Sequence, residues 1–491
     1  MRRLTALALT FSLLAVACQW LTPQPAPVSP TPPEPSLPDE NLPFRAGLTS
    51  GAQPVLEQLD DASRYELDLA LADDLLHLDG QGIIHYTNTE NMPLNEIQLR
   101  LFPNLLGGEM TVSNLRVDEA DVTPRFGLNN SLLIVPLRAT LESGQRTTVS
   151  MDFRVSLPSS VDQTNYGVLA YAEDVLALAH AYPMVAVYNE EGWNAELPPP
   201  SGDVTFADMA FFTVTVHAPE DLALTAVGRE ISRQVEDGRQ TVTYAAGPVR
   251  DFYLTASSAY EVTSRQVGET TVNFYAPRRL RSGAQAGLDV AARALADFSA
   301  RYAPYPYTEL DLAATPTLAL GIEYPGLIAI NERILDPEHA FLEGTVAHEV
   351  GHQWFYNLVG SDQLDHPWLD ESLAQYATLE YFFDEYGSQG YQGFRESLTG
   401  RWDQVNGQHI PIGLPVADYS NREYSAIVYG RGPLFFEALK NQMGAVAFDA
   451  FLRDYTITYS WGIATPAGLK TLAEQHCGCD LTPLFAEWVG P

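Results

Sequence analysis

The sequence predicts a multidomain protein in which an all-β domain, saddle-like or sandwich-like, is followed by an α+β domain. Two observations lead to this prediction. Between about Leu59 and Val262, short apolar segments with period-two alternation are separated by turn residues, which is typical of a β-sandwich or an open β-domain. After Pro277 the period changes, because residues 285–302 carry apolar side chains at helical spacing until Pro304 and Pro306 end the helix.

Length and composition agree with several folded domains. The chain has 491 residues, of which 46% are hydrophobic and 11% aromatic, so it can bury large cores and is not a disordered protein. Acidic residues outnumber basic ones by 62 to 28, which gives a formal charge of −34 at pH 7. This charge repels phosphate backbones, so we expect no nucleic acid as a partner. The acidity also suits cationic peptides, but a solubilising surface is the simpler interpretation.

The front of the chain resembles an export signal. Arg2 and Arg3 are followed by an apolar run over residues 4–17 that is too short to span a bilayer. Residues 14–18, LAVAC, resemble a bacterial lipobox, although Ala15 stands where Leu is commoner. Ordinary cleavage after Ala17 would leave the cysteine unexplained. We therefore expect a signal peptide over residues 1–17 and a lipid on Cys18.

A proline-rich segment follows the predicted lipid. Residues 18–58 are interpreted as an extended, semi-rigid tether, because no packable core is visible in them. Its prolines include Pro23, Pro25, Pro27, Pro30, Pro32, Pro33, Pro35 and Pro38. We expect an extracytoplasmic protein of the bacterial cell envelope, whose globular body is anchored to the membrane through Cys18.

Residues 59–262 are assigned to the N-terminal β-domain. Strand-like segments include residues 65–71, 97–102, 147–155 and 211–216. Tyr182, Pro183 and Trp193 could line a ligand surface, but aromatic side chains inside a β-domain more often belong to the core. Nothing in this domain carries chemistry by itself, so residues 263–491 are the place to look for function.

The second domain contains an H-E-x-x-H motif, formed by His348, Glu349 and His352 among apolar neighbours. Residues four apart lie on one face of a helix, so both imidazoles can bind one metal ion. Glu371 follows after eighteen intervening residues, on a second helical stretch, and is the predicted third ligand. Two imidazoles and a carboxylate with an open fourth position form a catalytic zinc site. We predict one Zn²⁺ per chain.

Glu349 is the predicted general base. It cannot comfortably ligate the same ion from its helical position, so it is left to take a proton from water and pass it to the leaving amine. Near the third ligand lie four further polar residues that could support the histidines: Asp362, Asp365, His366 and Asp370. Solvated turn residues are the simpler interpretation for these four.

Two further motifs flank the metal motif. Trp354, Phe355 and Asn357 extend it to H-E-x-x-H-x-W-F-x-N, and Trp368-Leu369 precede the third ligand. Residues 321–325, GIEYP, match a G-x-M-E-N pattern with Ile322 for Met, Tyr324 for Asn and Leu320 at the leading Gly. Residues 424–432, YSAIVYGRG, contain two tyrosines five apart followed by Arg-Gly. Together these motifs resemble the zinc aminopeptidase family typified by aminopeptidase N, which belongs to the gluzincin metallopeptidases.

The resemblance covers about residues 60–491 and implies a thermolysin-like catalytic domain over residues 263–491. It implies an aminopeptidase, which hydrolyses the N-terminal bond of a peptide. Tyr429 would donate a hydrogen bond to the oxyanion, and Tyr424 is a second candidate in the substrate site. Glu323 would bind the free α-ammonium, while the segment around Gly321 would pair with the substrate backbone as an added strand.

The end of the chain departs from the family pattern. Many members continue into a long helical domain over the active site, whereas this chain ends soon after Trp488, so we expect no C-terminal helical-repeat domain and a more open cleft. A zinc endopeptidase, or another zinc hydrolase with a relaxed requirement for a free amine, stays open as an alternative. A surface-binding lipoprotein with an inactive hydrolase domain is an alternative of another class. Cys477 and Cys479 are expected to be free thiols, because a disulfide would close a small, strained ring.

Overall fold

The computed structural model describes residues 40–199, 202 and 204–490. The folded unit spans Asn41–Pro491 and contains nearly all described residues. The predicted signal peptide, Cys18 and the tether up to residue 39 lie outside them. Within the described part of the chain, no helix combines the length and the apolar character needed to cross a membrane.

The end of the predicted tether is folded. It contains two four-residue helices, α1 (Leu42–Arg45) and α2 (Val55–Gln58). Its buried side chains are Phe44, Leu48, Val55 and Leu56. The ring of Phe44 lies 4.9 Å from that of Phe211. The tether prediction therefore extends too far along the chain, because these four apolar side chains bind a proline-rich segment to the body of the protein.

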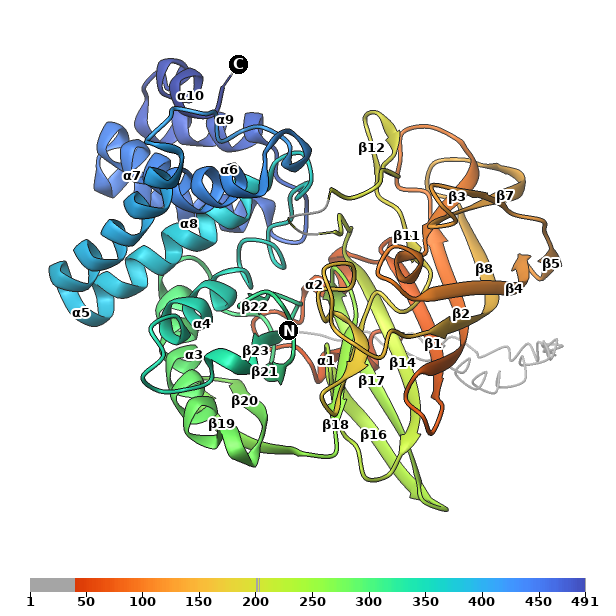
Figure 1. Ribbon diagram of the computed structural model, residues 1–491. Helices are drawn as coiled ribbons and strands as arrows, with labels where there is room; N and C mark the ends of the chain where they lie inside the picture. Colours follow the sequence, from red (N-terminus) through yellow and green to blue (C-terminus); the bar gives the residue numbers. More distant parts are fainter. Residues whose placement is uncertain (1–39, 200–201, 203, 491) are drawn as a thin grey trace, which may run out of the picture. The chain divides into compact units, whose positions relative to one another are not determined.

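The N-terminal part is β-rich, as predicted, and its largest sheet has eight strands (Figure 1). In spatial order they are β16 (Arg229–Glu236), β17 (Arg239–Val249), β14 (Ala210–Pro219), β1 (Ser63–Leu71), β2 (His77–Thr87), β8 (Arg146–Ser156), β4 (Glu109–Val117) and β5 (Ala120–Asp121). β1 pairs with β14 in parallel and with β2 antiparallel. Exposed and buried residues alternate along β2, because successive side chains of a strand point to opposite faces.

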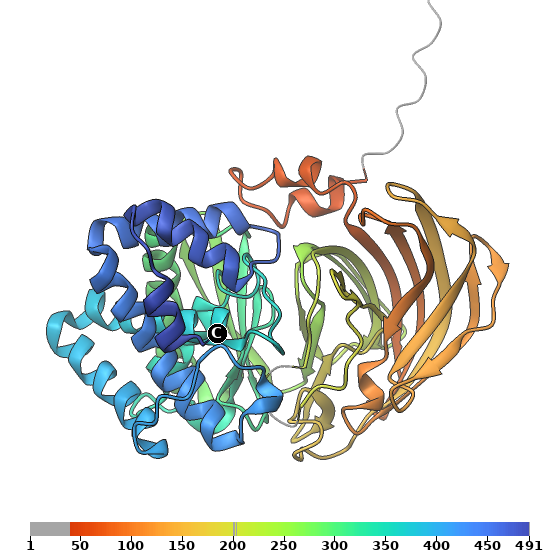
Figure 2. The same cartoon turned by 90° about the horizontal axis from the view of Figure 1, so that it is seen from above.

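Smaller sheets complete this part, and Figure 2 shows its strands as curved layers coloured from orange to yellow-green. One four-stranded sheet has the order β15 (Ala223–Ala226), β18 (Tyr253–Ser257), β10 (Val175–Ala179) and β9 (Leu169–Ala172). The other has the order β11 (Met184–Val185), β3 (Leu94–Arg100), β7 (Leu132–Leu141) and β6 (Arg125–Gly127), and a two-stranded ribbon joins β12 (Tyr188–Asn189) to β13 (Gly192–Trp193). Every residue of β10 and β18 is buried, so these two strands lie inside the core.

A separate five-stranded sheet begins the C-terminal part. Its order is β19 (Tyr260–Val267), β20 (Thr270–Pro277), β21 (Glu309–Thr315), β23 (Leu327–Asn331) and β22 (Gly321–Ile322). The three central strands are parallel, and the two edge strands run antiparallel to their neighbours. The predicted domain boundary between residues 262 and 263 falls inside β19. Because β19 pairs with β20 along its whole length, the structure places this boundary before Tyr260.

Helices dominate the remainder, as predicted. They are α3 (Arg281–Arg301), α4 (Leu342–Gly351), α5 (Glu371–Trp402), α6 (Asn421–Ala426), α7 (Gly432–Met443), α8 (Ala445–Tyr459), α9 (Pro466–Cys477) and α10 (Thr482–Trp488). Short helical turns are η1 (Phe102–Asn104), η2 (Arg278–Leu280), η3 (Glu332–Ile334), η4 (Pro367–Leu369), η5 (Asp403–Val405) and η6 (Val416–Asp418), and η7 (Ile427–Arg431) is a π-helical turn. α3 packs against β19 and β20, and α4 packs against α3 and α5. This packing places α4 in the interior of the C-terminal part (Figure 1).

Cys477 and Cys479 are joined by a disulfide, so the expectation of free thiols is wrong. Gly478 between them adopts the left-handed conformation, with φ of 60°, which glycine enters without steric cost. The two Cα atoms approach to 5.2 Å, a separation that ordinary disulfides span. The left-handed turn at Gly478 therefore allows the small ring that the sequence analysis expected to be too strained.

Candidate metal centre and substrate cavity

The H-E-x-x-H motif lies at the end of α4. His352 follows the last residue of α4 and keeps a helical backbone, with φ of −64° and ψ of −15°. The rings of His348 and His352 are therefore neighbours on one face, with centroids 4.5 Å apart and Nε2 atoms 3.0 Å apart. The second half of α4, from Thr345 to Gly351, is buried, which explains why the motif stands among apolar residues in the sequence.

α5 brings in the third predicted ligand. Glu371 is the first residue of α5, and its Oε2 lies 3.1 Å from His348 Nε2 and 3.4 Å from His352 Nε2. One ligand atom from each residue lies within 4.8 Å of the other two, and all three residues are buried. Two imidazole nitrogens and a carboxylate oxygen are a donor set that zinc prefers. The three residues predicted as ligands are thus brought together as a metal site requires.

The ionisation of these side chains also fits a cation. Burial, with neighbouring His352, lowers the pKa of His348 to about 4, so at neutral pH its imidazole is in the neutral form that ligates metals. Burial alone would raise the pKa of Glu371, but hydrogen bonds with His348 and His352 hold that pKa below its usual value. A buried, charged carboxylate facing two imidazole nitrogens suits a divalent cation.

Asp370 supports His352 from the other side of its ring. Asp370 Oδ1 lies 2.5 Å from His352 Nδ1, and Gln363 Nε2 donates to Asp370 Oδ2 at 2.5 Å. Asp370 is only 1% exposed, so the prediction of a solvated turn residue is wrong for this position. Nδ1 of His352 also lies 3.0 Å from the carbonyl oxygen of Phe355, so the carbonyl and the carboxylate together orient this imidazole. The signal that could have identified it is its place directly before the third ligand.

Two predicted residues, Glu323 and Glu349, lie beside the metal ligand His352. Glu323, Glu349 and His352 each offer an atom within 4.8 Å of the other two, and all are buried. A Cβ added at Gly321 would lie 2.4 Å from Glu349 Oε1, so the backbone of β22 packs directly against that carboxylate. Burial raises the pKa of Glu323 well above its usual value, and the carboxylates of Glu349 and Glu371 add to this effect. Such a group gains from a cation placed next to it.

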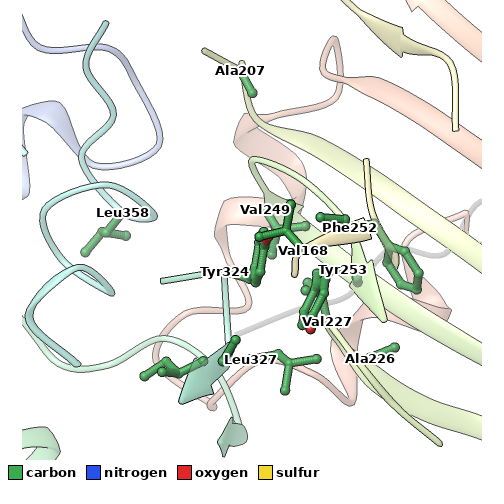
Figure 3. Packing of buried hydrophobic residues seen from close by; sticks show 14 of the residues in the cluster. Val168, Ala207, Ala226, Val227, Val249, Phe252, Tyr253, Tyr324, Leu327 and Leu358 are labelled. Atoms are coloured by element: carbon green, nitrogen blue, oxygen red, sulfur yellow. The ribbon is translucent and has the colours of Figure 1, made fainter. Parts of the chain in front are cut away.

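Tyr324 fixes the segment that carries Glu323. Its ring stacks on that of Tyr253 in β18, with centroids 3.9 Å apart and planes 18° apart. Figure 3 shows the two rings face to face, with Val249 and Phe252 nearby. The departure from the family pattern at this position, Tyr for Asn, therefore supplies an aromatic contact between the N-terminal β-rich part and the residue next to Glu323.

The two predicted tyrosines lie close to Glu371 and His348. Tyr429 belongs to the π-helical turn η7, and its hydroxyl donates a hydrogen bond to Glu371 Oε1. Its ring centroid is 5.9 Å from that of His348 and 5.6 Å from that of Tyr424. Both tyrosines border the same cavity. Tyr429 is thus in contact with the metal site, while Tyr424 is one ring further away.

A cavity of about 1550 Å³ opens onto these residues. The cavity is larger than the usual range of small-molecule sites, about 300–1,000 Å³, and so has room for a peptide. Its walls come from both parts of the fold, and the predicted site residues on them are Gly321, Glu323, His348, Glu349, His352, Glu371, Tyr424 and Tyr429. The residues predicted from the sequence to form the site therefore all border one cavity.

The β-rich part contributes residues that the sequence analysis missed. Phe102, His180 and Asp251 border the cavity, and Tyr356 donates to Asp251 Oδ2 at 3.0 Å. Burial raises the pKa of Asp251 to about 7. No motif marks these positions, because they reach the cavity through the packing of distant strands. The sequence had been interpreted as carrying no chemistry in this part of the chain.

Comparisons with known proteins agree with this geometry. Residues 286–488 match the family model of the peptidase family M1 domain. Aminopeptidase M1-B of Oryza sativa subsp. japonica is 29% identical over 298 residues, which are 57% of this chain and 34% of that protein. Probable aminopeptidase 1 of Saccharolobus solfataricus is 26% identical over 252 residues, 48% of this chain and 32% of that protein. The chain spans about a third of the length of the curated relatives it matches.

Solved structures extend the likeness to both parts of the fold. An M1 zinc metallopeptidase from Deinococcus radiodurans matches with a TM-score of 0.64 and 21% identity, over 88% of this chain and 94% of that one. A mutant of an M1 zinc metallopeptidase from the same organism, bound to a Tyr-Ser-Ala substrate, matches with a TM-score of 0.65 and 22% identity over 88% and 94% of the two chains. This likeness shows that the β-rich part and the helical part occur together in a known fold.

Proposed function

We propose that this chain, which contains a peptidase family M1 domain, is a zinc aminopeptidase that hydrolyses the N-terminal bond of peptides. The observation that carries the proposal is the convergence of three buried ligand atoms within 4.8 Å, with Glu349 and Glu323 beside the same histidine. The names of the relatives and the zinc in the names of the structural neighbours support the same activity.

His348, His352 and Glu371 would hold the zinc ion, and the chemistry supplied by zinc in such a site is Lewis acidity towards water and a carbonyl oxygen. Glu349 takes the proton of the attacking water and passes it to the leaving amine. Its carboxylate is held in place by the backbone at Gly321. Fixing the base next to the reacting atoms removes an entropic cost from the chemical step.

Tyr429 stabilises the oxyanion that forms at the attacked carbonyl. Its hydroxyl donates to Glu371 Oε1 in this structure, so a substrate oxygen close to the ligands can take over this hydrogen bond. A hydrogen bond that strengthens as charge develops lowers the barrier more than it tightens substrate binding. Asp370 keeps His352 oriented meanwhile, through the 2.5 Å contact to Nδ1.

Glu323 recognises the free α-ammonium of the substrate, and Tyr424 borders the same substrate cavity further out. A buried carboxylate with neighbouring acids is costly alone, and an ammonium group compensates its charge through charge-assisted hydrogen bonds. Gly321 in the edge strand β22 leaves backbone groups that can pair with a peptide as an added strand. Together these residues select the end of a peptide chain.

Aminoacyl 4-nitroanilides, assayed with and without 1,10-phenanthroline, test the activity. We expect turnover that the chelator abolishes and added zinc restores. A peptide with a free N-terminus should be cleaved at its first bond, and the same peptide with an acetylated N-terminus should not. Equal cleavage of both peptides would replace the aminopeptidase by an endopeptidase, because recognition by Glu323 requires the amine.

The variant Glu349→Gln tests the assignment of the general base. It keeps the shape of the side chain but cannot accept a proton, so kcat should fall by about 10²- to 10⁴-fold. Zinc content, measured by atomic emission, should stay at one ion per chain. Glu396→Gln removes an exposed carboxylate from α5 and should leave kcat unchanged. Undiminished activity of the Glu349 variant would refute the assigned base.

We further propose that the protein is exported and lipid-anchored through Cys18, which the lipobox-like residues 14–18 support. Replacing Cys18 by Ser should move the protein from the membrane fraction to the soluble fraction of cells that export it. Unchanged membrane retention of that variant would contradict the anchor, and it would leave the aminopeptidase proposal untouched.

A further inference from the structure

The charged side chains that border the substrate cavity are nearly all acidic. Carboxylates border it at Asp251, Glu323, Glu349 and Glu371. Among the described residues that border the cavity, Arg401 is the only arginine or lysine. The chain has more than twice as many acidic as basic residues. A single guanidinium among the acidic residues of the cavity therefore indicates a specific role for Arg401.

Arg401 approaches the metal ligands from the side of His348. Its Cζ atom lies 5.6 Å from the ring centroid of Tyr429, and that ring lies 5.9 Å from the His348 ring. Arg401 therefore lies next to Tyr429, which in turn lies next to His348. It is the last residue but one of α5, and its side chain is half-buried.

The guanidinium of Arg401 has no ion-pair partner. Arg395, the other arginine in the second half of α5, is held by Glu437 at 2.8 Å, and Arg301 is held by Glu380 at 3.1 Å. No carboxylate of the described residues lies within 4.0 Å of the Arg401 guanidinium. The contact with the Tyr429 ring leaves its N–H donors available, and the planar guanidinium matches the two oxygens of a carboxylate or a phosphate group.

The acid predicted to bind the ammonium lies beside the second histidine. Glu323 contacts His352 and Glu349. Beyond it, Asp251 is fully buried, and its Oδ1 has no hydrogen-bond partner in the part of the chain that the structure describes. Glu323 beside His352 thus attracts a cation, and Arg401 beside Tyr429 attracts an anion. A short peptide is a zwitterion that carries an ammonium at one end and a carboxylate at the other.

We infer that the preferred substrates are tripeptides with a free C-terminal carboxylate, which Arg401 binds while Glu323 binds the N-terminal ammonium. This inference rests on the proposed aminopeptidase function. An extended residue spans about 3.3 Å, and a charge-assisted hydrogen bond adds about 2.8 Å. Two residues after the scissile bond therefore reach about 9 Å, a length comparable to the two steps of 5.9 and 5.6 Å that lead from His348 through Tyr429 to Arg401. The single such residue of a dipeptide falls short.

Two forms of one peptide test the inference on the unmodified protein. The substrates are X-Gly-Gly and X-Gly-Gly-amide, where X is the residue preferred in the nitroanilide screen. We expect kcat/KM of the free acid to exceed that of the amide by about 10- to 100-fold, the range of a hydrogen-bonded charge, mainly through KM. Equal values would overturn the inference.

Variants then assign the effect to the residue. Arg401→Gln should raise KM for the free acid to that of the amide and leave the amide unchanged, while Arg401→Lys should retain part of the preference. Arg422→Gln, a change at an exposed arginine of α6 outside the cavity lining, should keep it in full. If Arg401→Gln instead lowers kcat equally for acid and amide, Arg401 acts through Tyr429 and the inference fails.

Two further controls separate the possible outcomes. An amidated peptide with Glu in second position supplies a carboxylate from a side chain, and a preference for it over X-Gly-Gly would overturn the C-terminal assignment. Aminoacyl nitroanilides carry no C-terminal carboxylate, so Arg401→Gln should cleave them as the unmodified protein does. Absence of nitroanilide turnover in the unmodified protein would refute the proposed function itself, which is a different result from the failure of the inference.

Discussion

Gly321 leaves the space that the side chain of the proposed general base, Glu349, occupies. Beyond the 2.4 Å contact to Glu349 Oε1, an added Cβ would lie 2.5 Å from both Cγ and Cδ of the same side chain. Real Cβ atoms do not approach so closely, and Glu349 is itself buried. The carboxylate can therefore give way only by leaving its position beside the metal ligands. A glycine here is required by the general base and not by a turn.

We expect Gly321→Ala to lower kcat by about 10- to 100-fold, because a displacement of about 1 Å at a catalytic group costs rates of this order. Zinc content and the melting temperature should change little, since the ligands stay in place. Gly51→Ala is the control, because a Cβ there meets no atom within 4 Å. A variant with normal kcat would show that Glu349 has more freedom than this contact allows.

At the scale of elements, β21 is tied to the β-rich part by a buried acid. Thr225 Oγ1 in β15 donates to Asp311 Oδ2 at 2.6 Å, and Asn273 Nδ2 in β20 donates to Asp311 Oδ1 at 2.9 Å. Burial, followed by the neighbouring carboxylate of Glu309, raises the pKa of Asp311 to about 7. The folded protein thus prefers the protonated acid at this junction.

The raised pKa fixes the sign of a pH effect on stability. In the unfolded chain the carboxyl ionises near its ordinary pKa of 3.8, whereas in the folded protein it ionises near 7. Between these values the unfolded state releases a proton that the folded state retains, so this group lowers stability as the pH rises from about 4 to about 7.

Asp311→Asn removes the titrating group from this junction. The melting temperature of the variant, relative to that of the unmodified protein, should therefore increase by at least about 2 °C over this pH range. Thermal melts at half-unit intervals of pH measure it. Asp221→Asn, at an exposed acid, should show a constant difference. A constant difference for Asp311→Asn as well would disprove the assigned pKa.

Elements with a strong local pattern were predictable from the sequence, and those made by distant packing were not. The alternation in β2 and the apolar environment of α4 are visible in the sequence because each element buries one face or all of its faces. α1 and α2 have four residues each, too few to show a helical period. Their order comes from contacts such as Phe44 with Phe211, which no local pattern contains.

The same distinction applies to the candidate site. His348, Glu349, His352 and Glu371 have fixed spacings on two helices, so a motif could identify them. Asp251 and Arg401 carry no motif, because one follows a strand of the β-rich part and the other lies near the far end of α5. Their importance appears only when the fold brings both to one cavity. Which charged residues border the cavity therefore depends on the tertiary structure and could not be predicted from the sequence.

At the scale of the whole folded unit, one buried arginine connects segments from distant parts of the chain. Arg250 follows β17, and its Nε donates to the carbonyls of Tyr356 and Asn357 at 2.7 and 3.0 Å. Its Nη1 donates to Ala207 at 3.0 Å, and its Nη2 donates to Gly462 at 2.6 Å. The β-rich part is thereby joined both to the loop after the metal motif and to the C-terminal helices.

Arg250→Met should therefore destabilise the unit as a whole. The change keeps apolar volume but leaves several buried carbonyl groups without their donor, each at a cost of about 1–3 kcal/mol. We expect the free energy of unfolding in urea to fall by about 3–5 kcal/mol, a large share of the stability of a natural domain. Arg116→Met, which breaks an exposed ion pair with Asp121, should cost less than about 1 kcal/mol.

The effect of Arg250→Met should also reach the metal, because Tyr356 and Asn357 lie only four and five residues after His352 in the chain. When the guanidinium is lost, the loop that they form has fewer contacts to hold the second histidine in place. Zinc affinity, measured by competition with a fluorescent chelator, should fall in the variant while all three ligands remain. If stability falls and zinc affinity does not, Arg250 holds the two parts of the fold together without supporting the site, and the loop after the motif is kept in place by its own packing.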